Sequence, residues 1–268
     1  MKNLLLFLIL LTIILSENLF SAGRDIFTYI DNDDYENIIR EIENMNDVNI
    51  TNHESFNNTP LMEVAFKLEN EDSQYQSIAL RLLQKGANPN YRNVFGTDAL
   101  HYAVKLHTTD TFLANCHKYG ADLEQKYYIN EETLLHSSME NGHYQAPVVI
   151  KYLVKHTKLV NVPTKRGLTP LMLAMMNNCR PYEGCGFKRE QIKDLVNGGA
   201  LVEVEDAFYH HTALEFGVES MNETYIDDFQ DLAFLIDHGA VVDQDALALA
   251  HRPGLLEFLK RYVNQSSL

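Results

Sequence analysis

The chain has little positive charge: it carries 22 Lys and Arg against 37 Asp and Glu, a formal net charge of −15 at pH 7. Binding to the phosphate backbone of a nucleic acid needs a basic surface, and so does docking to an anionic membrane. The composition therefore argues against both partners. Solubility is the simplest use of such an acidic surplus.

The sequence motifs of common enzymes are also missing. There is no Gly-x-Ser-x-Gly and no His-Glu-x-x-His, and Gly184-Cys185-Gly186 lacks the third glycine of a phosphate-binding loop. The paired His210 and His211 could bind a metal or an acidic group of a partner, but an exposed pair without a third ligand usually does neither. We therefore expect no catalytic residues, no cofactor and no metal, with an enzyme that uses a dispersed site as the remaining alternative.

Long hydrophobic runs are absent after the first residues of the chain. Positions 4–15 are apolar except for Thr12, Lys2 precedes them, and Ser21-Ala22-Gly23 offers small residues for cleavage. A helix of that length spans roughly 18 Å, short of the roughly 30 Å hydrocarbon core. The pattern predicts a signal peptide over residues 1–23, cleaved near Ala22 and Gly23, and a periplasmic or secreted protein. A buried N-terminal helix and an uncleaved anchor are the alternatives.

Cysteine is rare, with three in the chain. Cys116 falls in a predicted helix, where a small buried apolar role is expected. Cys179 and Cys185 flank a predicted loop of five residues, and in an oxidising compartment we expect a local disulfide between them. Two free thiols on an insertion are the alternative, and the spacing does not suit zinc.

A helix-opening phrase recurs five times along the chain. Each copy starts with Thr or Asp and has Leu two positions later, and successive Leu residues are 39, 35, 36 and 43 positions apart. Such self-similarity predicts a stacked array of helix pairs, none of which buries its apolar face alone. The copies are Thr59-Pro60-Leu61, Asp98-Ala99-Leu100, Thr133-Leu134-Leu135, Thr169-Pro170-Leu171 and Thr212-Ala213-Leu214.

Most of the predicted helix pairs have recognisable ends. The Thr or Asp is expected to cap the first helix by accepting a hydrogen bond from a backbone N–H, and Pro is tolerated at the next position. A glycine is expected to close the second helix in a left-handed conformation. These endings are Gly86-Ala87-Asn88, Gly120-Ala121-Asp122, Gly199-Ala200-Leu201 and Gly239-Ala240-Val241.

The layout resembles the ankyrin repeat, a roughly 33-residue unit with two antiparallel helices. The family's Thr-Pro-Leu-His-x-Ala opener is approached by Asp98-Ala99-Leu100-His101-Tyr102-Ala103, and Gly96 and Gly167 match the glycine before the cap. Gly86-Ala87-Asn88-Pro89-Asn90 echoes the family's ending. The resemblance covers about residues 31–262 and implies an all-α fold, an ankyrin-repeat solenoid of stacked helix-turn-helix units with short hairpin connections.

The resemblance also implies how the chain is divided. A solenoid over 24–268 is expected to follow the signal peptide, with partial caps at 31–57 and 244–264. The repeats between them are expected at 58–96, 97–131, 132–167, 168–210 and 211–243. His101 and His136 occupy the family's opener position, where the ring is expected to brace the turn.

In ankyrin-like proteins the hairpin tips and the exposed residues of the first helices form a concave face that contacts partners. Aromatic and Arg side chains supply most hot spots of protein interfaces. An alternative is that several of these side chains pack against neighbouring hairpins. The tip residues expected to bind are Arg92, Val94, Phe95, Tyr127, Tyr128, Ile129, Lys165, Arg166, Phe208, Tyr209 and His211, and the first-helix residues are Phe66, Lys105, Glu140, Met176 and Glu219.

The sequence therefore predicts a bacterial, exported, monomeric interaction module that binds a protein partner and does no chemistry. A periplasmic immunity or inhibitor protein that blocks a toxin is the more specific alternative. Its acidic charge would suit a basic toxin site.

Overall fold

The structure is a computed structural model that describes residues 25–68, 73–105, 110–127, 130–139, 146–176, 186–223 and 228–263. The chain divides into two compact units, Met1–Ala121 and Asp122–Leu268. The predicted signal peptide over 1–23 lies outside the described residues, and so do Tyr128, Ile129, Glu140, Cys179 and Cys185.

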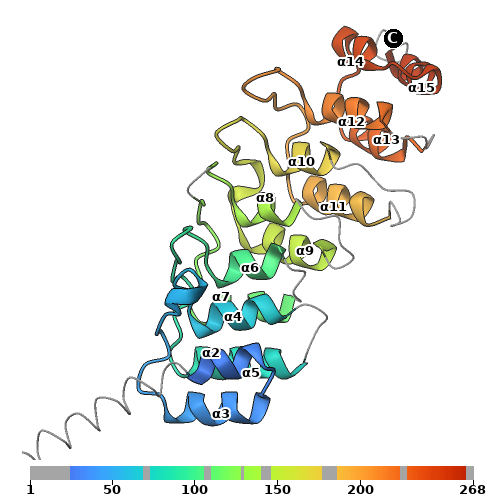
Figure 1. The fold of residues 1–268 in the computed structure, drawn as a ribbon. Helices are drawn as coiled ribbons and strands as arrows, with labels where there is room; N and C mark the ends of the chain where they lie inside the picture. The colour runs from blue at the N-terminus through green and yellow to red at the C-terminus, as the bar shows by residue number, and fades with distance from the viewer. Residues whose placement is uncertain are drawn as a thin grey trace, which may run out of the picture. The chain divides into compact units, whose positions relative to one another are not determined.

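The N-terminal unit contains three helix pairs. Its first helices α2, α4 and α6 pack on one another in one row, and its second helices α3, α5 and α7 pack in another (Figure 1). A 3₁₀ turn, η1 (His53–Ser55), precedes the second pair. The helices are α2 (Asp25–Asp31), α3 (Tyr35–Asn44), α4 (Pro60–Lys67), α5 (Ser73–Gln84), α6 (Ala99–Lys105) and α7 (Asp110–Lys118).

The C-terminal unit repeats the same arrangement with four pairs. Helices α8, α10, α12 and α14 follow one another in contact, and α9 packs against α11 (Figure 1). A 3₁₀ turn, η2 (Leu159–Asn161), follows α9. The helices are α8 (Leu134–Met139), α9 (Ala146–His156), α10 (Pro170–Met176), α11 (Gly186–Asn197), α12 (Ala213–Asn222), α13 (Gln230–Asp237), α14 (Gln244–Leu249) and α15 (Pro253–Val263).

The predicted caps open the first helices. The Thr212 hydroxyl accepts a hydrogen bond from the Glu215 N–H at 3.4 Å, and the Glu215 carboxylate accepts one from the Thr212 N–H at 2.6 Å, which forms a capping box. Asp98 accepts a hydrogen bond from the His101 N–H at 2.8 Å. The same role is confirmed for Thr59 and Thr169.

The glycines after the second helices have the predicted left-handed backbone. At Gly199 φ is +93°, and the next N–H, of Ala200, donates to the Leu195 carbonyl at 2.9 Å. A side chain at such a φ is strained, whereas glycine is not. Gly86, Gly120 and Gly239 also have positive φ.

In each unit the two rows of helices enclose an apolar core, and Phe112 of the N-terminal unit and Leu214 of the C-terminal unit are completely buried. Cys116 is buried too, as predicted, and burial raises the pKa of its thiol far above the ordinary value. Among the helices in the described ranges, none is both long enough and apolar enough to cross a bilayer.

Candidate functional site

The second hairpin of the N-terminal unit is held by one buried side chain, Asn93. Its carboxamide oxygen accepts hydrogen bonds from the N–H groups of Phe95 at 2.9 Å and Thr97 at 3.0 Å. Its amide group donates to Asn58 at 2.8 Å and to the Tyr102 hydroxyl at 3.1 Å. The backbone at the tip is therefore fixed from beneath, while its side chains remain outside.

Two exposed aromatic rings meet at this tip. Phe95 is 58% exposed and Phe56, from the preceding hairpin, is 55% exposed, yet their ring centroids are only 4.7 Å apart. The Val94 N–H donates to the Phe56 carbonyl at 3.1 Å and joins the two hairpins. Phe95 was predicted at a tip, whereas Phe56 was not, because the pairing joins segments about one repeat apart.

The first helices beside these tips present further predicted residues. Phe66 on α4 is 52% exposed and meets Tyr102 of α6 edge to face, with centroids 6.1 Å apart. Arg92 and Lys105 are half-buried. Burial and the positive charges of Lys105 and Arg92 lower the pKa of His101 to about 4, so its ring is neutral at pH 7.

The first hairpin of the C-terminal unit corrects one expectation. Tyr127 was predicted as an exposed contact residue, but it is only 6% exposed, and its N–H donates to the Glu132 carbonyl at 2.7 Å. The predicted bracing role of His136 is found: Nδ1 accepts from the Thr133 N–H at 3.0 Å, and Nε2 donates to the Leu168 carbonyl at 3.0 Å.

The next hairpin presents Lys165 and Arg166, both exposed as predicted. The hydroxyl of buried Thr164 accepts from the N–H groups of Arg166 and Leu168, each at 3.3 Å. At Gly167 φ is +79°, and a Cβ there would collide with the backbone of Ala207 in the following hairpin. Glycine is therefore needed at this position both for its conformation and for its size.

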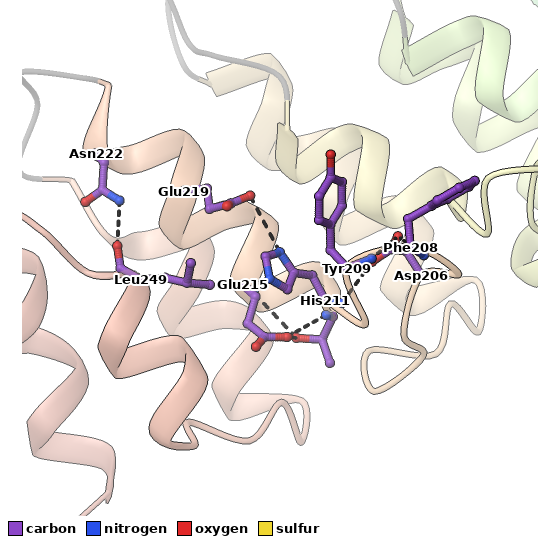
Figure 2. A network of polar contacts seen from close by, with 9 residues as sticks. Asp206, Phe208, Tyr209, His211, Glu215, Glu219, Asn222 and Leu249 are labelled. Atoms are coloured by element: carbon purple, nitrogen blue, oxygen red, sulfur yellow. Dashed lines mark hydrogen bonds and ion pairs between the residues drawn. The ribbon is translucent and has the colours of Figure 1, made fainter.

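The last hairpin is held by a buried carboxylate. Asp206 accepts from the N–H groups of Phe208 at 2.8 Å, Tyr209 at 3.1 Å and His211 at 2.8 Å (Figure 2). Burial alone would raise the pKa of Asp206, but these backbone hydrogen bonds outweigh burial and lower it. Phe208 is 65% exposed and Tyr209 is 64% exposed, so both predicted tip aromatics face outward.

His211 is mostly buried and contacts the tip from one side. Its side chain is 18% exposed and lies between Tyr209 and Glu219 of α12 (Figure 2). The ring centroids of Tyr209 and Phe216 are 5.7 Å and 5.5 Å away, and Nδ1 is 3.7 Å from a Glu219 carboxylate oxygen. Of the other predicted first-helix residues, Met176 and Glu219 are exposed.

Three of these hairpins thus share a feature that sequence reasoning missed. In each of them, a buried polar residue at the start of the hairpin accepts hydrogen bonds through its side chain from N–H groups of the tip. Its identity differs each time, so no single-letter pattern reveals it. The signal available in the sequence is a residue that commonly forms such local turns, placed two residues before the tip. These residues are Asn93, Thr164 and Asp206.

One group of carboxylates has ligand-like spacing: Glu215, Asp243 and Asp245. Two of the three already have structural roles, since Glu215 completes the cap of α12 and Asp243 accepts from the Ala246 N–H at 2.8 Å to cap α14. The positions of Glu215 and Asp243 are therefore accounted for by helix capping.

Known proteins share both the repeat and the fold. Residues 107–185 match the family described as ankyrin repeats in three copies. The ankyrin repeat domain of Bcl-3, a member of the IkappaB family, is 18% identical with a TM-score of 0.67 and covers 88% of this chain and 97% of its own. The human ASB11 ankyrin repeat domain is 18% identical with a TM-score of 0.66 and covers 88% and 96%.

A third similar structure is a chain of the complex between a predatory endopeptidase from Bdellovibrio bacteriovorus and an immunity protein. The match is 22% identical with a TM-score of 0.56 and covers 80% of this chain and 97% of that one.

Paired helices joined by hairpins define a helical repeat protein. Residues 107–185 match ankyrin repeats, and the fold of the described residues is the predicted all-α ankyrin-repeat solenoid. Ankyrin repeats are typically modules for protein interaction rather than catalysis, and these matches point to no enzyme family.

Proposed function

We propose that the protein is an exported module that binds a protein partner, as a monomer, through the hairpin tips and first helices of its units. One observation supports this most strongly. In the described residues, every large exposed aromatic side chain lies on a hairpin or a first helix. These side chains are Phe56, Phe66, Phe95, Phe208 and Tyr209.

Exposed aromatic rings at fixed positions suit an interface. Buried Asn93 and Asp206 hold the backbone at Phe95, Phe208 and Tyr209, so ordering these three side chains on binding costs little entropy. Aromatic side chains bury a large area with few rotatable bonds, which is why they dominate interface hot spots.

The more specific proposal is an immunity or inhibitor protein of a bacterial envelope. Three features support it: the signal-like residues 1–23, the acidic charge of −15, and the shared fold with a chain of an endopeptidase–immunity protein complex. N-terminal sequencing of the chain secreted or retained by an expressing bacterium tests export, with a start near Gly23 as the expected result.

The binding face is tested with the purified protein as bait for extracts of the organism that encodes it. The captured partner is then purified and titrated by calorimetry against two triple variants. Replacing Phe95, Phe208 and Tyr209 by Ser is expected to weaken binding at least about tenfold, because hot-spot aromatics are lost. Replacing Val148, Leu201 and Val241 by Ser is the control. These apolar side chains are also exposed, but they lie on the second helix α9 or just after the second helices α11 and α13.

The control triple variant should bind like the original chain. A partner that binds the tip variant unchanged would show that the face has been assigned to the wrong side chains.

A further inference from the structure

The negative charge of the protein is concentrated in one stretch. Residues 194–251 contain thirteen Asp and Glu and no Lys or Arg, so they carry −13 of the net charge of −15. This stretch includes the last hairpin with helices α12, α13 and α14. The rest of the chain is nearly balanced, and the attraction for positive charge is therefore local.

The exposed tip aromatics lie inside this acidic stretch. Glu205, whose side chain is 59% exposed, lies on the hairpin that carries Phe208 and Tyr209, and Glu219, 45% exposed, lies beside the same tip on α12 (Figure 2). Each carboxylate faces a histidine: Glu205 is 3.6 Å from His210, and Glu219 is 3.7 Å from His211. These distances exceed a hydrogen bond, so both carboxylates keep capacity for a stronger cation.

We propose that the tip of the last hairpin and the part of α12 beside it, which carry Tyr209, Glu205 and Glu219, bind a Lys or Arg side chain on an exposed segment of the protein partner. The inference rests on the proposed function and adds the chemistry of the partner. The aromatic face attracts the cation and packs its carbon stem, and the carboxylates pair with its charge. Charges at such a rim also accelerate encounter with a basic partner.

The positive charges of the neighbouring hairpin predict how the partner segment is oriented on the surface. Lys165 and Arg166 are exposed there, and the Arg166 carbonyl accepts from the Ala207 N–H at 3.3 Å, so the two hairpins are adjacent. A complementary segment is basic where it meets Tyr209 and acidic or neutral where it meets Arg166. A uniformly basic partner fits the surface less well, because like charges at contact are repelled.

The proposal is tested with a labelled peptide of alternating Arg and Leu, about eight residues long, whose binding to the purified protein is followed by fluorescence anisotropy at about 150 mM salt. The double variant Glu205→Gln, Glu219→Gln is expected to weaken binding about tenfold. The control Glu190→Gln, Asp237→Asn removes the same charge from the outer helices α11 and α13 and should change binding less than about twofold.

Three further measurements define the site. Tyr209→Ser should weaken binding while Tyr209→Phe preserves it, because the ring face makes the contact. Lys165→Glu with Arg166→Glu should strengthen binding of the Arg peptide. A peptide of alternating Glu and Leu should bind more weakly than the Arg peptide.

Equal weakening by both charge variants would show general attraction to an acidic protein and overturn the proposal, as would no binding of the Arg peptide. The proposed function has a separate outcome. If a captured partner loses affinity for the tip variant but not for Glu205→Gln, Glu219→Gln, the interaction module stands and this inference fails.

Discussion

Asn161 in one repeat holds the backbone at Leu201 in the next. Its carboxamide oxygen accepts from the Leu201 N–H at 2.8 Å, and its amide donates to the Gly199 carbonyl at 2.8 Å. The side chain therefore satisfies two backbone groups of the loop that follows helix α11.

The same relationship recurs in both units. Asn49 accepts from the Asn88 N–H at 2.7 Å and donates to Gly86, while Glu203 accepts from the Val241 N–H at 3.0 Å. In these three cases, a polar residue after the second helix of one repeat binds backbone groups just after the second helix of the following repeat. These hydrogen bonds link repeats at their edge without using the core.

Replacing Asn161 by Ala should destabilise the protein. Both hydrogen bonds are lost but the groups are exposed to water, so the free energy of unfolding should fall by about 1–2 kcal/mol. Asn161→Asp should lie between Ala and Asn, because it keeps the acceptor and loses the donor. Urea denaturation followed by circular dichroism measures this, with Asn197→Ala at the exposed end of α11 as the control.

Gly167→Ala should be more harmful than Gly199→Ala. Both glycines have positive φ, which costs Ala about 1–2 kcal/mol. At Gly167 the new Cβ also collides with the backbone of Ala207 and would lie 2.8 Å from the Ala207 Cβ, whereas at Gly199 nothing lies within 4 Å. Denaturant midpoints of the two variants decide this. Equal midpoints would contradict the close approach of the two hairpins.

The unfolding free energy should fall as pH drops from 6.5 toward 4. Burial lowers the pKa of His101 to about 4 in the folded protein, from 6.5 when unfolded. Within this window the unfolded chain binds the proton and the folded chain does not, so acid favours unfolding, by up to roughly 3 kcal/mol. The pH profile of His101→Gln should be flatter by this amount, while His251→Gln, at an exposed site, should leave the profile unchanged.

Because of Lys188, the free energy of unfolding should rise at alkaline pH. Burial lowers its pKa to about 8 from 10.5, against the opposing charge of Asp231, although the amine still donates to the Met175 carbonyl at 3.0 Å. Stability should therefore rise between pH 8 and 10.5, where the unfolded chain keeps the proton and the folded chain has lost it, by up to roughly 3 kcal/mol.

Lys188→Met should remove that rise, as measured by urea midpoints across this pH range. Lys193→Met, on an exposed part of the same helix, should not. A rise of the same size in both variants would mean that another group is responsible.

Local signals in the sequence predicted much of the fold. Thr212 and Asp98 cap helices because capping depends on residues three positions apart, and Gly199 adopts positive φ because only its own backbone matters. The division of the chain at Ala121 was not predicted, because the repeat phrases continue across it.

The site was predicted less completely. Phe95, Phe208 and Tyr209 are exposed at tips as expected, but Tyr127 is turned inward. Whether a tip residue faces water depends on how the hairpin is paired, which the repeat pattern does not specify. Phe56 depends on a tertiary contact with Phe95, which the repeat pattern does not specify. The role of Asp206 is local, and its signal is a turn-forming residue two positions before the tip.

The buried acceptor beneath three of the hairpins separates the shape of the loop from the chemistry that it displays. Asp206 fixes the path of the chain through the N–H groups, which every residue except proline possesses. The side chains at positions 208 and 209 can therefore be exchanged without rebuilding the loop. Such a hairpin acts as a cassette, in which new partners can be selected by surface substitutions while the support beneath stays unchanged.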